Sequence, residues 1–399
     1  MKLQAYDTAW AFGTALCTRV ARWQRQQLLS SAQQADIEAA YPLDYYRPAW
    51  PLSVGLFIFT WLGLAMAGGF SFLITGNSPF AAGVLYCAAC FGVLELLIRE
   101  RRFYHAGPDN ALLYSGLGAA SGLVLYVFSE FIRPERQYYD FGLTSGYLAA
   151  PLLIILVVLA FAVLRYADAL VTAAAFFTIL LLVVIAALQS NLGQALLPFL
   201  LMGTAATVLV LRRVVARRLA STPLADYYAT CLLVLKVLGL AVFYLGGNYL
   251  VVREGNAELH HLMASEQVPF ALLFYVLTAG IPFLYITWGL RRADRATLLL
   301  GLLALAFSLF TLRHYRSLLP PEIAALVAGV VLVALAGALL RALRPARFGL
   351  TSLPDDEPQH FNLENLIQAQ TAHAPAAPAA GGFEFGGGQS GGGGATGQF

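Results

Sequence analysis

The chain has 399 residues, of which 59% are hydrophobic and only 12% are charged. A soluble domain carries about 25% charged residues, so this composition excludes a soluble globular protein of this size. The formal net charge of +3 is too small to indicate a nucleic-acid partner. Because the apolar residues are clustered in long runs, the sequence predicts an all-α bundle of about ten transmembrane helices, with the lipid bilayer as its main partner.

Residues 1–50 precede the first long apolar run and are expected to form a cytoplasmic helix and connector. Apolar or small residues recur there at spacings of three and four: Leu3, Tyr6, Trp10, Gly13, Cys17 and Val20. This spacing predicts an amphipathic helix, whose apolar stripe could lie among lipid headgroups or pack against the membrane domain. A second short helix is expected from Ser31, because Ser31 and Gln34 have the spacing of a capping box.

Continuous apolar runs then fill a membrane domain, residues 51–341. A helix of about 20 residues crosses a hydrocarbon core about 30 Å thick, and only a helix satisfies its own backbone within one segment there. The expected spans are 52–75, 80–98, 111–132, 148–165, 168–188, 195–211, 227–252, 269–290, 296–312 and 322–340. The shortest connection, Tyr166 and Ala167, separates spans four and five.

The basic residues predict the orientation of the spans. If the connections alternate between two sides, 19 of the 25 Lys and Arg residues fall on the side that holds both termini and five on the other, with Lys236 inside a span. Loops rich in Lys and Arg stay in the cytoplasm. We therefore expect a multi-pass protein with both termini in the cytoplasm.

Small residues recur at helical spacing inside several spans. The pairs are Gly63 and Ala67, Gly118 and Gly122, and Gly329 and Gly337. Small residues let helix backbones approach closely. These pairs predict either tight packing within one bundle or a homo-oligomer formed through the same helix faces.

Residues 342–399 are polar, then rich in Ala and Pro, then rich in Gly, and this composition predicts a disordered cytoplasmic tail. The tail ends in GGFEFGGGQSGGGGATGQF and resembles the glycine-rich, aromatic-ended tails of some bacterial membrane-associated proteins.

The segment Arg102–Gly118, RFYHAGPDNALLYSGLG, lies between spans two and three and contains His105 and Asp109. It resembles the second cytoplasmic loop of uncharacterised bacterial predicted membrane proteins, and the resemblance extends over roughly residues 20–125. The resemblance implies a bacterial inner-membrane location. It implies no activity. From the residues alone, Gly107 and Pro108 predict a turn.

Lys236 is the one cation expected well inside a span. Charge at such depth costs at least about 2.5 kcal/mol unless it is paired or hydrated. Glu95, near the cytoplasmic end of span two, is the carboxylate expected at the nearest depth. Two arrangements are open: the two residues form an intramembrane polar site, or Glu95 pairs with Arg99 while Lys236 extends alone to the headgroups.

Two further candidate sites lie elsewhere in the sequence. Thr278, Gly280 and Pro282 occur together in span eight. A proline removes a backbone donor and kinks a helix, and such interruptions can line a transport path.

Glu258, His260 and His261 lie in the loop that follows span seven. Imidazole and carboxylate groups can bind a divalent metal, although adjacent histidines point in different directions. A solvated loop is the alternative interpretation.

No motif of catalysis or cofactor binding occurs: the chain has no Walker A loop, no HExxH and no GxSxG. We therefore expect no cofactor, and an enzyme is the least favoured class. The sequence leaves two functions open. One is transport or permeation of a small solute, and the other is a membrane scaffold that recruits partners through its terminal segments.

Overall fold

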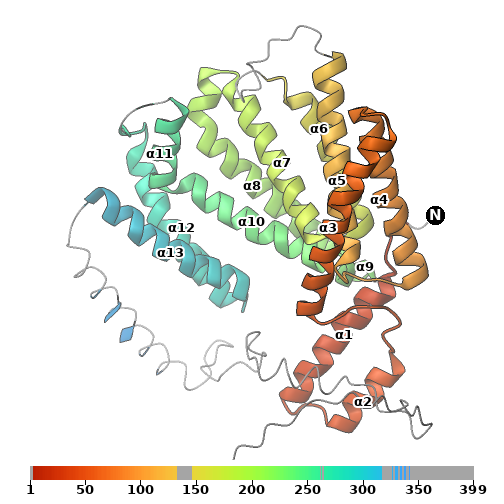
Figure 1. Ribbon diagram of the computed structural model, residues 1–399. Helices are drawn as coiled ribbons and strands as arrows, with labels where there is room; N and C mark the ends of the chain where they lie inside the picture. The colour runs from red at the N-terminus through yellow and green to blue at the C-terminus, as the bar shows by residue number, and fades with distance from the viewer. Residues whose placement is uncertain are drawn as a thin grey trace, which may run out of the picture. The chain divides into compact units, whose positions relative to one another are not determined.

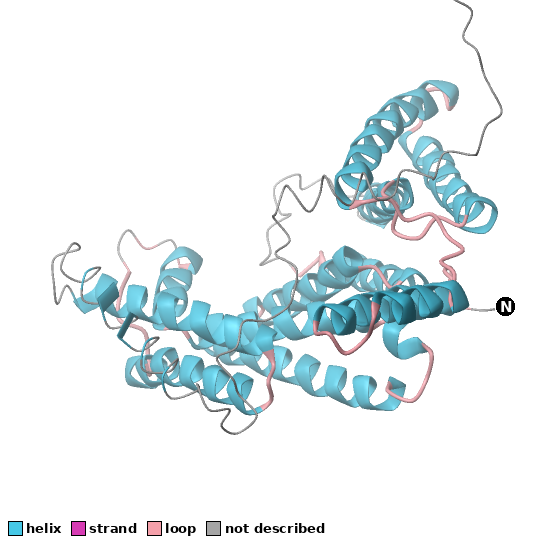
Figure 2. Ribbon diagram, turned by 90° about the horizontal axis from the view of Figure 1, so that it is seen from below, coloured by secondary structure: helices cyan, strands magenta, loops and turns pink. Residues whose placement is uncertain are grey.

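The computed structural model describes residues 3–132, 146–260, 262 and 265–316, with scattered positions between 326 and 341. Over these residues the chain is helical, as Figures 1 and 2 show. The helices are α1 (Thr8–Arg25), α2 (Ser31–Ala40), α3 (Trp50–Ile74), α4 (Pro79–Arg101), α5 (Pro108–Val127), the π-helical turn η1 (Phe128–Ile132), α6 (Ala149–Tyr166), α7 (Ala169–Leu188), α8 (Asn191–Leu219), α9 (Leu224–Tyr227), α10 (Ala229–Gly247), α11 (Tyr249–Leu259), α12 (Ala271–Arg291) and α13 (Arg295–Arg316). The predicted all-α fold is confirmed.

Nine of the described helices are long and apolar enough to cross a membrane. They are α3 to α8, α10, α12 and α13, and they match the first nine predicted spans in order. Large apolar side chains cover their outer surfaces: Phe59 and Met66 of α3 are 77% and 78% exposed. Such a surface needs lipid around it, so the chain is an integral membrane protein. The predicted span 322–340 lies largely outside the described residues, and the tail 342–399 lies wholly outside them.

The connection between spans four and five is confirmed at the predicted place. Ala167 adopts a left-handed conformation with φ 49° and ends α6. Asp168 then accepts a hydrogen bond from the backbone N–H of Val171 at 2.9 Å and caps α7. Helices α6 and α7 therefore form a tight antiparallel hairpin.

Two predicted boundaries differ from the structure. The capping box of α2 uses Ser30 and Gln33, one residue earlier than predicted, and both of its hydrogen bonds form. Span seven is not continuous, because α10 ends at Gly247 and α11 begins at Tyr249. Two glycines weaken the helix before this point, and the extended Asn248 caps the next helix with its own side chain.

The helices pack mainly against their neighbours in the chain. Helices α3, α4 and α5 form one group, α6 packs between α5 and α7, and α8 packs along α10. Helix α10 also contacts α7, α12 and α13, and α12 packs along α13. The largest buried cluster joins Tyr6 and Ala11 of the N-terminal segment to residues of α4 to α7.

Segments that the sequence assigned to the cytoplasmic side meet at one end of the bundle. The backbone N–H of Ala5 donates to the carbonyl oxygen of Arg165 at 2.8 Å. Arg19 forms an ion pair with Asp226 at 2.6 Å. These contacts support the assumption of the charge count that successive connections alternate between two sides. We call this end of the bundle the Arg-rich end.

Candidate functional site

Three carboxylates lie where the N-terminal segment meets α4, α5 and α7 at the Arg-rich end. They are Glu95, Asp109 and Asp168, and together we call them the carboxylate cluster. Asp109 is fully buried and Asp168 is 3% exposed. Buried carboxylates are rare unless they are paired or hydrogen-bonded, so the donors around each one indicate what the cluster does.

Asp109 accepts hydrogen bonds on both oxygens. The turn before α5 directs the backbone N–H groups of Ala106 and Gly107 at its Oδ1, at 2.9 and 3.0 Å. This turn requires glycine, because Gly107 has φ 114° and a Cβ there would lie 2.3 Å from the carbonyl oxygen of Ser53. The hydroxyl of Tyr6 donates to Oδ2 at 2.9 Å. Asp109 thus holds the start of the chain against α5.

Asp168 caps α7 with Oδ1 and accepts a hydrogen bond from the hydroxyl of Tyr114 on Oδ2, at 2.9 Å. The hydroxyl of Thr172 donates to the backbone carbonyl of Asp168 at 2.6 Å. One side chain therefore ends the connection between α6 and α7 and joins it to α5. This double role explains why a carboxylate is buried at a helix start.

Glu95 accepts hydrogen bonds from Arg165 Nε and Nη2 at 2.9 and 2.7 Å and from the hydroxyl of Tyr166 at 2.8 Å. Arg99, one turn along α4, lies 3.7 Å away. Arg165 also donates to the backbone carbonyl of Leu3 at 3.2 Å. Glu95 and Arg165 therefore link α4 and α6 to the N-terminal segment.

The tyrosine at the centre of these contacts stays protonated. Burial raises the pKa of Tyr6 well above 10, and the charge of Asp109 and the hydrogen bond to it raise the pKa further. Burial also raises the pKa of the neighbouring Tyr104 to about 12, against the opposing charge of Arg47. The Tyr6 hydroxyl is thus a permanent donor over the physiological pH range.

The carboxylate cluster is arranged to hold the N-terminal segment and the helices together rather than to react with a substrate. Each carboxylate is engaged by donors from within the chain, and a general base needs a free lone pair directed at a substrate. Tyr6, which is 2% exposed, packs in one buried cluster with residues of α4 to α7, so this part of the apolar stripe lies against the membrane domain, whereas Leu3 is 44% exposed.

The first predicted arrangement, in which Lys236 and Glu95 form one polar site, is wrong. Lys236 forms its ion pair with Asp294, which lies in the connection between α12 and α13. Burial acts to raise the pKa of Asp294, but the hydrogen bonds from Lys236 and Thr297 outweigh it, so this pKa is below its ordinary value. Glu95 does contact Arg99, as the alternative arrangement predicted, but Lys236 does not extend alone to the headgroups.

The predicted kink residues lie in a continuous helix, since α12 runs through Pro282. Thr278 is fully buried, and its hydroxyl accepts from the backbone N–H of Tyr249 at 2.9 Å. A Cβ on Gly280 would meet no atom within 4 Å, so this glycine is not at a close helix approach. The role of these residues in gating stays a prediction.

Thr278 belongs to a polar network that the sequence did not reveal. The network surrounds the break at Asn248, which is fully buried and donates to the hydroxyls of Tyr244 and Thr311 at 2.9 and 3.1 Å. Asn248 Oδ1 also accepts from the backbone N–H of Leu250 at 3.1 Å. Among the described residues, the one buried side-chain polar atom without a hydrogen bond is Nε of Arg253.

The weak metal candidates gain no support. Glu258 and His260 are exposed, and His261 lies outside the described residues. Within the described part of the chain, no three His, Cys, Asp or Glu side chains are grouped to hold a metal ion.

The predicted small-residue faces are open where the structure describes them. A Cβ on Gly63, Gly118 or Gly122 would meet no atom within 4 Å. These glycines therefore do not serve close packing against another described helix of this chain. A homo-oligomer through the same faces stays a prediction.

The sequence contained one signal for the carboxylate cluster. Glu95, Asp109 and Asp168 all fall at the cytoplasmic ends of predicted spans. Acidic residues in a layer dominated by arginine would be expected to find partners there, but the charge count used only Lys and Arg.

No family model matches the chain, and no curated protein or solved structure is similar to it.

Proposed function

We propose that the chain is a scaffold of the bacterial inner membrane, with both termini in the cytoplasm, that recruits a protein partner through its N-terminal module, residues 3–50. The proposal rests on apolar side chains that this module exposes outside any span. Phe12, Trp23, Leu28 and Leu43 are 39%, 41%, 68% and 49% exposed. Exposed apolar patches beyond the membrane are typical of interaction surfaces.

The attachment of the module supports the proposal. Tyr6 and Arg19 tie it to the bundle through Asp109 and Asp226. Helix α2 buries no residue. The apolar side chains are therefore held at a fixed place relative to the membrane domain, which lowers the ordering cost of binding a partner.

The test compares the size of the complexes that the wild-type protein and its variants form in native membranes. We expect wild-type protein, solubilised gently, to migrate as a larger complex than the purified chain in native electrophoresis. The double variant Phe12→Ser and Leu28→Ser should migrate as the purified chain does, whereas the control Gln26→Ser should behave as wild type. Identical migration of the wild type and the double variant would contradict the proposal.

Solute transport is the second candidate, and the broken helix at Asn248 is the observation in its favour. Transporters often place their sites at broken helices near the midplane. Lys236 of α10 pairs with Asp294 in the connection between α12 and α13, and Asn248 follows Lys236 by about 18 Å of helix at 1.5 Å per residue. Tyr249 also contacts Thr278 within α12, so the break lies inside a core about 30 Å thick rather than at its far boundary. If polyols and amino acids enter proteoliposomes no faster than empty liposomes, transport of these solutes is excluded.

A further inference from the structure

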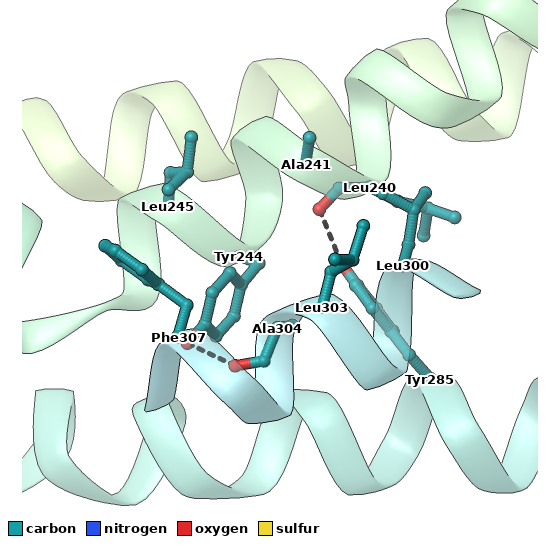
Figure 3. A pocket seen from close by; sticks show the side chains of 9 residues that line it. All are labelled: Leu240, Ala241, Tyr244, Leu245, Tyr285, Leu300, Leu303, Ala304 and Phe307. Atoms are coloured by element: carbon teal, nitrogen blue, oxygen red, sulfur yellow. Dashed lines mark hydrogen bonds between the residues drawn. The ribbon is translucent and has the colours of Figure 1, made fainter. Parts of the chain in front are cut away.

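The chain exposes apolar surface both within its spans and outside them. Within the spans, an open groove lies between α10 and α13 (Figure 3). Tyr244 in this groove donates its hydroxyl to the carbonyl oxygen of Ala304 at 2.8 Å. Tyr285 donates to the carbonyl oxygen of Leu240 at 2.9 Å. Only carbon surface remains there, and the acyl chains of a bilayer cover such a surface without a protein partner. The apolar side chains of α1 lie outside the spans and need another cover.

One face of α1 carries these side chains. Phe12, Leu16 and Trp23 follow one another at spacings of four and seven residues, which places them on one side of the helix. Phe12 is 39% exposed, Trp23 is 41% exposed, and Leu16 is half-buried. From the first to the last, these residues cover about 16 Å of helix at 1.5 Å per residue, the length of about three turns of a partner helix.

Leu28 continues this face beyond the end of the helix. Helix α1 stops at Arg25, and Gln27 adopts a left-handed conformation with φ 57°. The backbone N–H of Leu28 donates to the carbonyl oxygen of Trp23, and that of Gln27 donates to Gln24, both at 2.9 Å. These are the two hydrogen bonds of a Schellman motif, which brings together the residues at the positions of Trp23 and Leu28. We call Phe12, Leu16, Trp23 and Leu28 the apolar row of α1.

The charge beside the apolar row complements an acidic partner. Residues 8–35 include three arginines and no Asp or Glu. Asp226 pairs with Arg19 at 2.6 Å, and Arg22 and Arg25 are exposed in the last turn, beside Trp23. Trp and Arg are the side chains that most often dominate binding between proteins, and the guanidinium group binds carboxylates at two points.

The apolar row leads away from the membrane. The backbone N–H of Ala5 donates to the carbonyl oxygen of Arg165 near the end of α6, so the start of α1 adjoins the ends of the spans. Figure 1 shows α1 running from there toward α2, which lies farther from the spans than the first turn of α1 does. Trp23 and Leu28 are at this far end. Their position favours a protein segment over a lipid headgroup as the occupant.

We propose that the apolar row binds an acidic amphipathic helix of a partner protein. Apolar side chains of that helix cover Phe12, Trp23 and Leu28, and its carboxylates pair with Arg22 and Arg25. The inference rests on the proposed scaffold function and names the chemistry of the partner. Docking of an amphipathic helix by its apolar face is a general mode of recognition, and opposite charges at the edge fix its register.

The experiment places the full chain in phosphatidylcholine nanodiscs and measures its binding to immobilised peptides by interferometry. The probes have about 14 residues, or about 21 Å as a helix. They are an amphipathic Leu/Glu peptide, a Leu/Lys peptide of the same pattern, and a Ser/Glu peptide without an apolar face. Only the Leu/Glu peptide should bind above the signal of empty nanodiscs. Raising the salt concentration from about 0.1 to about 1 M shortens the Debye length from about 10 to about 3 Å and should weaken this binding several-fold.

Charge reversal gives a variant that gains binding, so its result does not depend on a loss of folding. Arg22→Glu with Arg25→Glu should weaken binding of the Leu/Glu peptide about tenfold, which is 1.4 kcal/mol, and should create binding of the Leu/Lys peptide. The matched control, Arg217→Glu with Arg218→Glu, changes two exposed arginines at the end of α8 and should behave as wild type.

A second pair of variants tests the apolar contact. Trp23→Ser removes the large side chain at the centre of the surface and should weaken binding of the Leu/Glu peptide several-fold. Gln26→Ser, at an exposed position just beyond the helix, should leave this binding unchanged.

Three results would overturn the proposal. Equal binding of the Leu/Glu and Leu/Lys peptides would show that the arginines do not select the charge of the partner. Cosedimentation of the nanodiscs with phosphatidylglycerol vesicles, lost in the Arg22→Glu and Arg25→Glu variant and without peptide binding, would assign the surface to lipid headgroups. If that variant keeps the native complex that Phe12→Ser with Leu28→Ser loses, the scaffold function stands and an acidic partner is excluded.

Discussion

Replacement of Tyr6 by phenylalanine tests the attachment of the N-terminal module with the smallest change of shape. The change removes one hydroxyl that donates to Asp109 at 2.9 Å, between two buried side chains. A hydrogen bond to a charged group contributes about 1.5–3 kcal/mol. Asp109 keeps its two backbone donors, so we expect a loss of about 2 kcal/mol, in the lower part of that range.

This loss should appear as local opening rather than as global unfolding, since the other partners of Asp109 remain. Hydrogen exchange of the α1 amides should become about 30-fold faster in Tyr6→Phe, with exchange in α4 and α5 unchanged. The matched control is Tyr41→Phe, which alters a tyrosine that is 50% exposed. Unchanged exchange in α1, or equal acceleration throughout the chain, would refute the attachment through Tyr6.

The ion pair of Lys236 with Asp294 and the cap at Asn248 can be tested by thermal denaturation in detergent. Lys236→Met should lower the free energy of unfolding by about 2 kcal/mol, because it leaves a partly buried carboxylate without its ion pair. Asp294→Asn added to it should recover part of the loss, and additive effects would contradict the pair. Because the pKa of Asp294 is lowered in the folded state, its stabilisation should be present at neutral pH, should begin to decline below about pH 4, and should be lost as the pH falls through the lowered pKa. An advantage of wild type over Asp294→Asn that does not decline at all below about pH 4 would be inconsistent with this. Asn248→Leu should cost about 3 kcal/mol, because it leaves buried backbone and hydroxyl groups without partners, and an unchanged melting temperature would exclude the capping role.

The positions of the spans could be predicted because hydropathy is summed over about 20 residues, and small local errors cancel. Span one was expected at 52–75 and α3 covers Trp50–Ile74. The narrow connection at Ala167 could also be found, since a charged pair interrupted two apolar runs. The break at Asn248 was missed, because an apolar run continues across it and only the cap geometry ends the helix.

The partners of the buried charges could not be predicted, because they depend on which helices are neighbours. Lys236 was matched to Glu95 by depth alone, which assumed that spans two and seven adjoin. The structure packs α10 against α8, α12 and α13 instead, and this brings Asp294 to Lys236. The bond from Tyr6 to Asp109 joins residues 103 positions apart, and no periodicity in the sequence encodes such a pair.

Photo-crosslinking from position 28 in native membranes tests the scaffold proposal most directly. Leu28 is 68% exposed in the N-terminal module, and Leu309 is 51% exposed on the span α13. A photoreactive amino acid at position 28 should give one discrete protein adduct, which the Phe12→Ser change weakens, while position 309 should give lipid adducts. Lipid adducts alone from position 28 would place this surface among the headgroups and contradict the recruitment of a protein partner.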